Sequence, residues 1–131
     1  MSAYVLDASA AIELAAAGYS DPGPHRLLAP TLLRSQTLSI LHERVMAGHV
    51  RAAEAKQLLD GIAGMPIRLL GDRVLRGTAW KVADELGWTD TYDAEYVALT
   101  RLHGDALVTA DADLMRRLDG VISTLAPAVL L

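Results

Sequence analysis

Short apolar runs alternate along this sequence with longer segments in which apolar residues recur at helical spacing. The runs predict strands at residues 3–6, 67–70, 106–109 and 121–123. The longer segments predict helices at residues 9–17, 31–47, 52–62, 72–86, 92–103 and 111–118. Strands that are apolar along their whole length are typical of parallel sheets, because helices cover both faces of such sheets. We therefore expect an α/β protein, a three-layer α/β/α sandwich on a short parallel β-sheet.

Residues 19–30, which contain three prolines and a glycine, predict a loop. The 131 residues suit a single domain over residues 1–131, since 52% of them are apolar. The absence of cysteine excludes disulfides and thiolate metal sites, and the net charge of −4 argues against a uniformly basic nucleic-acid-binding surface. No apolar run reaches the roughly 20 residues of a membrane span, and the first residues lack the pattern of a signal peptide. We expect a cytoplasmic protein with no membrane partner.

Three acidic residues follow the predicted strands closely. Asp7 comes directly after the strand at 3–6, and Asp111 and Asp113 come just after the strand at 106–109. Ligands of parallel sheets bind at the carboxyl ends of the strands, which lie along one edge. A single acid in such a place has an ordinary interpretation too, because a negative charge stabilises the start of a helix. Two separate strands that end in carboxylates nevertheless predict a site at that edge.

Asp93 lies in the first turn of the predicted helix at 92–103, where it could again serve the helix dipole. Tyr96 and Val97, three and four residues later, place Asp93 on the apolar stripe that faces the sheet. A carboxylate there needs a cation, a hydrogen-bond donor or a raised pKa. Asp90 can share that edge, although its position also suits a helix cap.

Several carboxylates in one pocket repel each other unless a cation lies between them. The candidate catalytic and metal-binding residues are Asp7, Asp93, Asp111 and Asp113. Clusters of oxygen ligands suit Mg²⁺ or Mn²⁺. Two such ions, about 3.5–4 Å apart, can activate a water and stabilise the leaving oxygen in phosphodiester cleavage. The acids therefore predict a metal-dependent nuclease site.

Four segments together resemble the PIN-domain family, and in particular the VapC-type toxins of prokaryotic toxin–antitoxin pairs. They are VLDAS at 5–9, APTLL at 29–33, TYDAEYVAL at 91–99 and LVTADADL at 107–114. The resemblance implies a PIN-like sandwich and a Mg²⁺- or Mn²⁺-dependent endoribonuclease, the toxin of a type II toxin–antitoxin system. It also implies an RNA substrate, a homodimer and a cognate antitoxin that blocks the site.

The same resemblance gives individual residues their expected roles. Asp7, Asp93 and Asp111 are expected to be the core metal ligands, with Asp113 as an accessory acid. The hydroxyls of Ser9 and Thr109 are expected to orient these carboxylates or a water.

Gln36 is the one departure from the family pattern. Members of the family usually carry a glutamate at the corresponding place in the helix that follows the APTLL segment, whereas this chain has an amide. An amide oxygen can ligate Mg²⁺, but it brings no charge and cannot act as a base. The alternative hypothesis is therefore a catalytically weakened PIN-fold binding module that sequesters an antitoxin or RNA.

Other features are weaker indications. Arg116 and Arg117 follow the predicted acidic site, and their guanidinium groups can contact RNA phosphates. Trp80 and Trp88 are expected to be anchors in the core or in a dimer interface, with base stacking as the alternative. A receiver-like phosphoacceptor is a third hypothesis, and Asp72 is its only candidate. The histidines show no metal-binding spacing, and no glycine-rich phosphate loop or Gly-x-Ser-x-Gly motif occurs.

Overall fold

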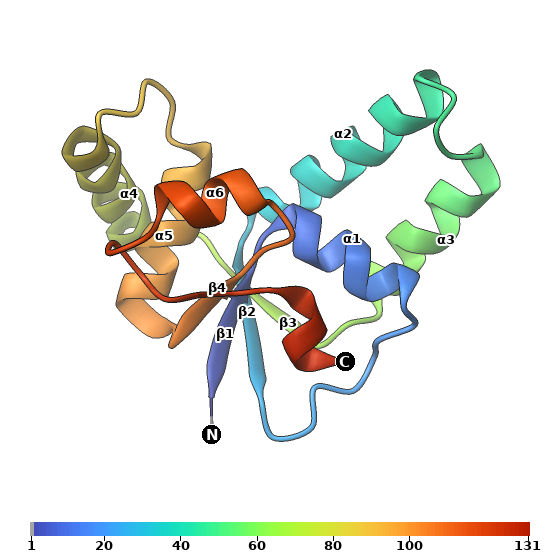
Figure 1. Cartoon of the computed structure of the whole chain (residues 1–131), viewed down its shortest axis with the longest axis horizontal. Helices are drawn as coiled ribbons and strands as arrows, with labels where there is room; N and C mark the ends of the chain where they lie inside the picture. Colours follow the sequence, from blue (N-terminus) through green and yellow to red (C-terminus); the bar gives the residue numbers. More distant parts are fainter. Residues whose placement is uncertain (1) are drawn as a thin grey trace.

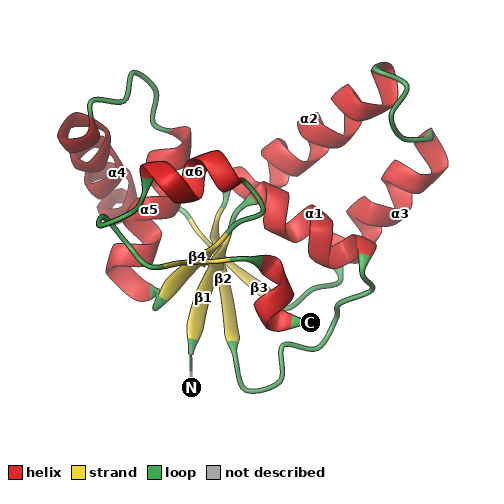
Figure 2. Cartoon of the chain, viewed as in Figure 1, coloured by secondary structure: helices red, strands yellow, loops and turns green. Residues whose placement is uncertain are grey.

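The computed structural model describes residues 2–131, and a sheet of five parallel strands lies at its centre (Figure 2). The strands are β1 (Ala3–Leu6), β2 (Arg26–Pro30), β3 (Ile67–Leu70), β4 (Ala106–Val108) and β5 (Thr124–Leu125). Their order across the sheet is β3-β2-β1-β4-β5, and every neighbouring pair is parallel. Val5 of the central strand β1 stands opposite Leu28 of β2 and Leu107 of β4.

Helices cover both faces of this sheet (Figure 1). They are α1 (Ala8–Ala16), α2 (Leu32–Met46), α3 (Ala52–Ala63), α4 (Arg73–Leu86), α5 (Tyr92–His103), α6 (Ala112–Arg117) and the 3₁₀ helix η1 (Pro127–Leu130). Helix α5 contacts β1, β2 and β4 on one face, and α4 packs along α5, while α1 contacts α2, α3 and η1. The three-layer α/β/α sandwich expected from the sequence is thereby confirmed. Within residues 2–131, no helix has the length and apolar character needed to cross a membrane.

Successive residues of a strand point to opposite faces, so each strand contributes to two hydrophobic clusters. Val5 and Leu107 belong to the cluster between the sheet and α5, and both are fully buried. Leu6 and Val108 belong to the cluster between the sheet and α1, and they too are fully buried. This two-sided burial explains why the strands are apolar along their whole length.

Two predictions about the strands are wrong. Residues 19–30 are not all loop, because Arg26–Pro30 form β2, which pairs with β1 on one side and β3 on the other. The last strand is Thr124–Leu125 and not 121–123, because Val121 and Ile122 donate backbone hydrogen bonds to Leu118 and continue the turn after α6. In both places pairing with a neighbouring strand, which local composition does not encode, decides the structure.

The N-caps of the helices differ in their side-chain contacts. Asp7 is the N-cap of α1, where its side chain accepts a hydrogen bond from the Ala10 amide. Thr31 and Thr91 stand at the N-caps of α2 and α5, but neither side chain makes a cap hydrogen bond.

The strand order defines where this fold offers a site. The chain moves from β1 outward to β2 and β3, and then returns to the other side of β1 to form β4 and β5. Connections therefore leave β1 and β4 in opposite directions, which opens a crevice between the carboxyl ends of these two strands. Asp7 follows β1 and Asp111 follows β4, so the acids predicted from the sequence lie at this crevice.

The close approach of α5 to β1 gives a test of the packing. Gly104→Ala should lower the free energy of unfolding by about 1–3 kcal/mol, because an added Cβ would lie 2.9 Å from Val5 Cγ2 and 3.2 Å from Thr100 Cα. In the matched control, Gly77→Ala on α4, the new Cβ meets nothing within 4 Å. That substitution should raise the stability by about 0.5–1 kcal/mol. Urea denaturation followed by circular dichroism measures both, and equal effects would contradict this packing.

Candidate functional site

Asp7 is the most deeply placed acid of the site, with 7% of its surface exposed. Its backbone amide donates to the Val108 carbonyl at 3.2 Å, which extends the β1–β4 pairing by one residue. Its Oδ1 accepts hydrogen bonds from the Ser9 hydroxyl at 2.7 Å and the Ala10 amide at 2.9 Å, and its Oδ2 accepts one from the Thr109 hydroxyl. Both carboxylate oxygens are thus fixed in direction.

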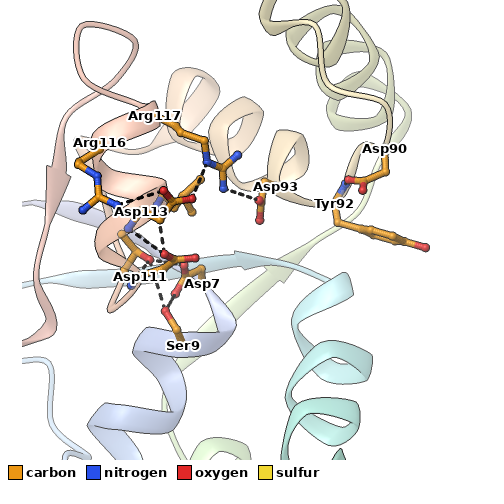
Figure 3. Close-up of polar contacts among 11 residues, drawn as sticks. Asp7, Ser9, Asp90, Tyr92, Asp93, Asp111, Asp113, Arg116 and Arg117 are labelled. Carbon is orange, nitrogen blue, oxygen red and sulfur yellow. Dashed lines mark hydrogen bonds and ion pairs between the residues drawn. The ribbon is translucent and has the colours of Figure 1, made fainter.

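Ser9 and Thr109 join the segment after β1 to the segment after β4. The Ser9 hydroxyl accepts a hydrogen bond from the Ala110 amide at 2.9 Å, and the Thr109 hydroxyl accepts one from the Asp111 amide at 3.1 Å. Because the same two hydroxyls donate to Asp7, they hold the two strand ends together around its carboxylate (Figure 3).

Asp111 and Asp113 are near neighbours in sequence but take different positions. Asp111 is the N-cap of α6, and its Oδ1 accepts from the amides of Asp113 and Leu114 at 3.0 and 3.1 Å. Asp113 is 65% exposed at its side chain and forms ion pairs with Arg116 and Arg117, each at 3.2 Å. Asp111 therefore belongs to the crevice, whereas Asp113 lies on its outer rim.

Asp93 reaches the crevice from the first turn of α5. An oxygen of its carboxylate lies 3.6 Å from Arg117, whose guanidinium also bonds Asp113 (Figure 3). The same guanidinium lies 5.5 Å from the ring centre of Trp88. Arg117 is thus a cation of the chain itself that stands between two of the acids.

The electrostatics of the acids are coupled. Burial raises the pKa of Asp7, hydrogen bonds from Thr109, Ser9 and Ala10 offset part of the rise, and the charge of Asp93 adds to it. Burial also raises the pKa of Asp93; nearby Arg117 lowers it, and the charges of Asp111 and Asp90 raise it. The charge of Asp93 thus acts on Asp7 and the charge of Asp111 acts on Asp93, so acids from three separate parts of the chain are near neighbours.

Gln36 approaches this cluster from α2. Its amide oxygen accepts a hydrogen bond of 2.6 Å from the hydroxyl of Tyr96, a residue of α5 that is 1% exposed. Burial, followed by the charges of Asp7, Glu95 and Asp93, raises the pKa of Tyr96, so its hydroxyl remains a donor. The sequence predicts Tyr96 only as part of the apolar stripe, although its spacing of three residues from Asp93 indicates that its hydroxyl lies beside the acids.

The carboxylate oxygens of the site are ligands of the kind that a hard divalent cation prefers. Asp93 Oδ1 and Asp111 Oδ2 accept no hydrogen bond from the described residues, and Asp7 Oδ2 accepts a single one. Among residues 2–131, however, no three acidic or histidine side chains already stand at the spacing of a metal-binding group. One oxygen of Asp93 is paired with Arg117, so a cation held by Asp7, Asp93 and Asp111 would compete with that guanidinium for the carboxylate.

Four further candidates from the sequence do not join Asp7, Asp93 and Asp111. Asp90 is exposed, precedes the N-cap Thr91, and accepts a hydrogen bond from the Tyr92 amide at 3.3 Å. Asp72 caps α4 after the edge strand β3, which is the wrong place for the central phosphoacceptor of a receiver-like protein. Trp80 is 67% exposed, so it is not a core anchor, whereas Trp88 is partly buried against the core.

Comparisons with known proteins give a likeness at the level of structure. No protein-family model and no curated protein matches the sequence. PAE2754 from Pyrobaculum aerophilum, a solved structure, is 28% identical with a TM-score of 0.76, over 98% of this chain and 92% of its own. A chain of VapBC-1 from nontypeable Haemophilus influenzae is 14% identical with a TM-score of 0.61, over 96% of this chain and 98% of its own. These likenesses extend over nearly the whole chain, and its fold is a PIN-like α/β/α sandwich.

Proposed function

We propose that this chain is a Mg²⁺- or Mn²⁺-dependent endoribonuclease, the toxin component of a type II toxin–antitoxin system. The observation that carries the proposal is the placement of Asp7 after β1 and Asp111 after β4, with Asp93 near enough for its charge to act on Asp7 and for that of Asp111 to act on it. The resemblance of four sequence segments to VapC-type toxins supports the same function, as do the PIN-like fold and the likeness to VapBC-1.

In this proposal Asp7, Asp93 and Asp111 hold the cation, with Asp113 as an accessory acid at the rim. A bound divalent cation supplies an activated water and stabilises negative charge on the leaving oxygen of a phosphodiester. The chain itself supplies orientation, because the hydroxyls of Ser9 and Thr109 fix both oxygens of Asp7. Such outer contacts typically change metal affinity or activity by about 10- to 100-fold when they are removed.

Arg116 and Arg117 are the proposed phosphate contacts. The side chain of Arg116 is 73% exposed, and that of Arg117 is 42% exposed at the edge of the crevice. If Asp93 held a cation, the guanidinium of Arg117, which is now paired with Asp93, would be available to pair with an RNA phosphate. The acidic net charge of the chain is compatible with an RNA substrate, since bound cations neutralise the acids of the site.

The proposed partners are a cognate antitoxin that covers the crevice and a second copy of the chain. Both follow from the resemblance to VapC-type toxins, and the neighbour named VapBC-1 supports the first. An antitoxin has to neutralise or shield the same acids that hold the cation, so cleavage must be assayed on antitoxin-free protein.

A binding module without catalysis is the second candidate, and Gln36 favours it. The amide brings no negative charge to the cluster, and its oxygen already accepts a hydrogen bond from Tyr96. In that case the fold binds RNA or an antitoxin but does not cleave. We favour the nuclease because the three acids at the crevice are all present.

Asp7→Asn should raise the melting temperature of the metal-free protein, because it removes a buried charge and keeps an oxygen that can cap α1. The raised pKa of Asp7 means that the folded protein binds this proton more tightly than the unfolded chain, so ionisation as the pH rises costs stability. The difference in melting temperature between Asp7→Asn and the wild type should therefore be largest near pH 7.5 and shrink toward about pH 5. Scanning fluorimetry in EDTA measures it.

The same assay reports on the cation. Mg²⁺ or Mn²⁺ at about 100 times its dissociation constant should stabilise the wild type by about 2.7 kcal/mol, and Asp7→Asn should lose most of this gain. Asp60→Asn, an exposed acid on α3, is the matched control and should keep it. A wild-type melting temperature that responds to neither ion would argue against a metal site.

Asp93→Asn should lower RNA cleavage by at least about 100-fold, because it removes one of the three proposed ligands. The assay incubates pure, antitoxin-free protein with a structured RNA, with and without Mg²⁺ or Mn²⁺, and follows the products on a denaturing gel. Asp60→Asn again serves as the control. Cleavage that continues in EDTA, or that Asp93→Asn leaves intact, would refute the proposed mechanism.

Gln36→Glu should increase both cation affinity and cleavage, because it adds a carboxylate beside the three acids while keeping an acceptor for Tyr96. Gln57→Glu, on the exposed face of α3, makes the same change of charge away from the site and should alter neither quantity. Isothermal titration with Mn²⁺ and the cleavage assay give the two readouts. An unchanged or lower rate in Gln36→Glu would show that Gln36 does not occupy the glutamate position.

A further inference from the structure

A second hollow lies along the same edge of the sheet as the acids. It is a cavity of about 480 Å³ that we call the α4 pocket, and the argument uses Thr31, Gly71, Arg73, Arg76, Trp80 and Glu95 from its lining. Thr31 follows β2 and Gly71 follows β3, so the pocket stands at the carboxyl ends of these strands. The acids stand at the carboxyl ends of β1 and β4, and the two sites therefore share one edge of a single sheet.

The floor of the α4 pocket depends on a close contact between two strand ends. A Cβ on Gly71 would lie 2.7 Å from the Thr31 hydroxyl oxygen, so only glycine allows this approach. The Thr31 amide donates to the Leu70 carbonyl at 3.0 Å and holds the same two segments together. The pocket is thus built on the rigid part of the fold.

One wall of the pocket is a stripe of basic and aromatic side chains on α4. Arg73, Arg76 and Trp80 are spaced by three and four residues, so they project from one side of the helix. All three are exposed, and neither arginine forms an ion pair with any residue of the described part of the chain. Asp72 also lines the pocket, but its carboxylate accepts a hydrogen bond from the Leu75 amide as the cap of α4.

The opposite wall belongs to the start of α5, which also carries Asp93. Glu95 is half-buried there, and its carboxylate makes no hydrogen bond or ion pair within residues 2–131. Burial raises the pKa of Glu95. Thr91 also lines the pocket, two residues before Asp93, so the pocket extends to the start of the helix that carries Asp93.

The geometry points to the α4 pocket as a binding site for one nucleotide of single-stranded RNA, next to the nucleotide that is cleaved. The base stacks on Trp80, its N–H groups face the carboxyl of Glu95, and the flanking phosphates pair with Arg73 and Arg76. Aromatic stacking, guanidinium–phosphate pairs and carboxyl contacts to base edges are the usual chemistry of single-strand recognition. This inference rests on the proposed nuclease function and adds to it the residues that select the RNA.

The test measures RNA binding apart from cleavage. A fluorescein-labelled hexanucleotide without secondary structure is titrated with the full chain in EDTA, and fluorescence anisotropy gives the dissociation constant. Trp80→Ala should weaken binding by about 5- to 100-fold through lost stacking. Arg76→Gln should weaken it and reduce the slope of log affinity against log salt concentration by about one. Glu95→Gln should change the order of preference among hexanucleotides that differ in one base.

Matched controls make these changes specific to the pocket. Arg51→Gln removes the same charge at the turn between α2 and α3, which Figure 1 places far from α4. Val74→Ala shortens another exposed apolar side chain on α4, one that does not line the pocket. Neither control should alter the affinity or the salt slope.

The outcomes separate this inference from the proposed function. If the wild type cleaves RNA but the three pocket variants bind it as the controls do, the pocket inference is overturned and the nuclease stands. If the wild type neither binds nor cleaves RNA with Mg²⁺ or Mn²⁺, both fail. If Trp80→Ala converts a dimer to a monomer in sedimentation and leaves RNA affinity unchanged, Trp80 belongs to a subunit interface and the inference is overturned.

Discussion

The hydrogen bonds around the carboxylate of Asp7 are the contacts on which the rest of the site depends. Asp7 ends β1, caps α1 and accepts hydrogen bonds from Ser9 and Thr109, which in turn bind the backbone after β4. A buried carboxylate is costly unless such donors surround it. One side chain thereby joins the central strand, the first helix and the segment that carries Asp111. The crevice of the doubly wound sheet is consequently lined by backbone and side chains that cannot move independently.

Asp93 and Asp113 are held by contacts with arginines, unlike Asp7, whose carboxylate accepts several hydrogen bonds. Asp93 faces Arg117, and Asp113 pairs with both arginines of α6 at the rim. The guanidinium of Arg117 thus offsets part of the negative charge of these acids. It contacts the carboxylate of Asp93, which is also a proposed ligand of the cation. Gln36, joined to Tyr96, adds no charge on the side of α2. Under the proposed function, a cation held by Asp93 would compete with Arg117 for the carboxylate, and the guanidinium of Arg117 would then be available to an anion such as a phosphate.

Under the two proposals, cleavage and RNA recognition would take place at two neighbouring pairs of strand ends along the carboxyl edge of the sheet. The ends of β1 and β4 carry the acids, and the ends of β2 and β3 form the base of the α4 pocket. Helix α5 links the two, since Asp93 faces the acids and Glu95, two residues later, faces the pocket. A single-stranded RNA that lies along this edge would contact the proposed catalytic acids at one end and the α4 pocket at the other. This arrangement assigns the exposed Trp80 to a functional surface, a possibility that the sequence left open beside core or dimer-interface packing.

The sequence by itself determined the fold class and the placement of Asp7 and Asp111 at the carboxyl edge of the sheet, because both depend on local patterns. Apolar strands and amphipathic helices predict a parallel sheet with two covered faces, and acids directly after strands must lie at its carboxyl edge. Only the tertiary structure decided what depends on partners distant in the chain. Strand pairing with β1 and β3 makes Arg26–Pro30 a strand although it ends in a proline, and the fold brings Arg117 of α6 within 3.6 Å of Asp93 on α5. Contacts of this kind have no signature in a local window, because their energy arises from groups that only the folded chain brings together.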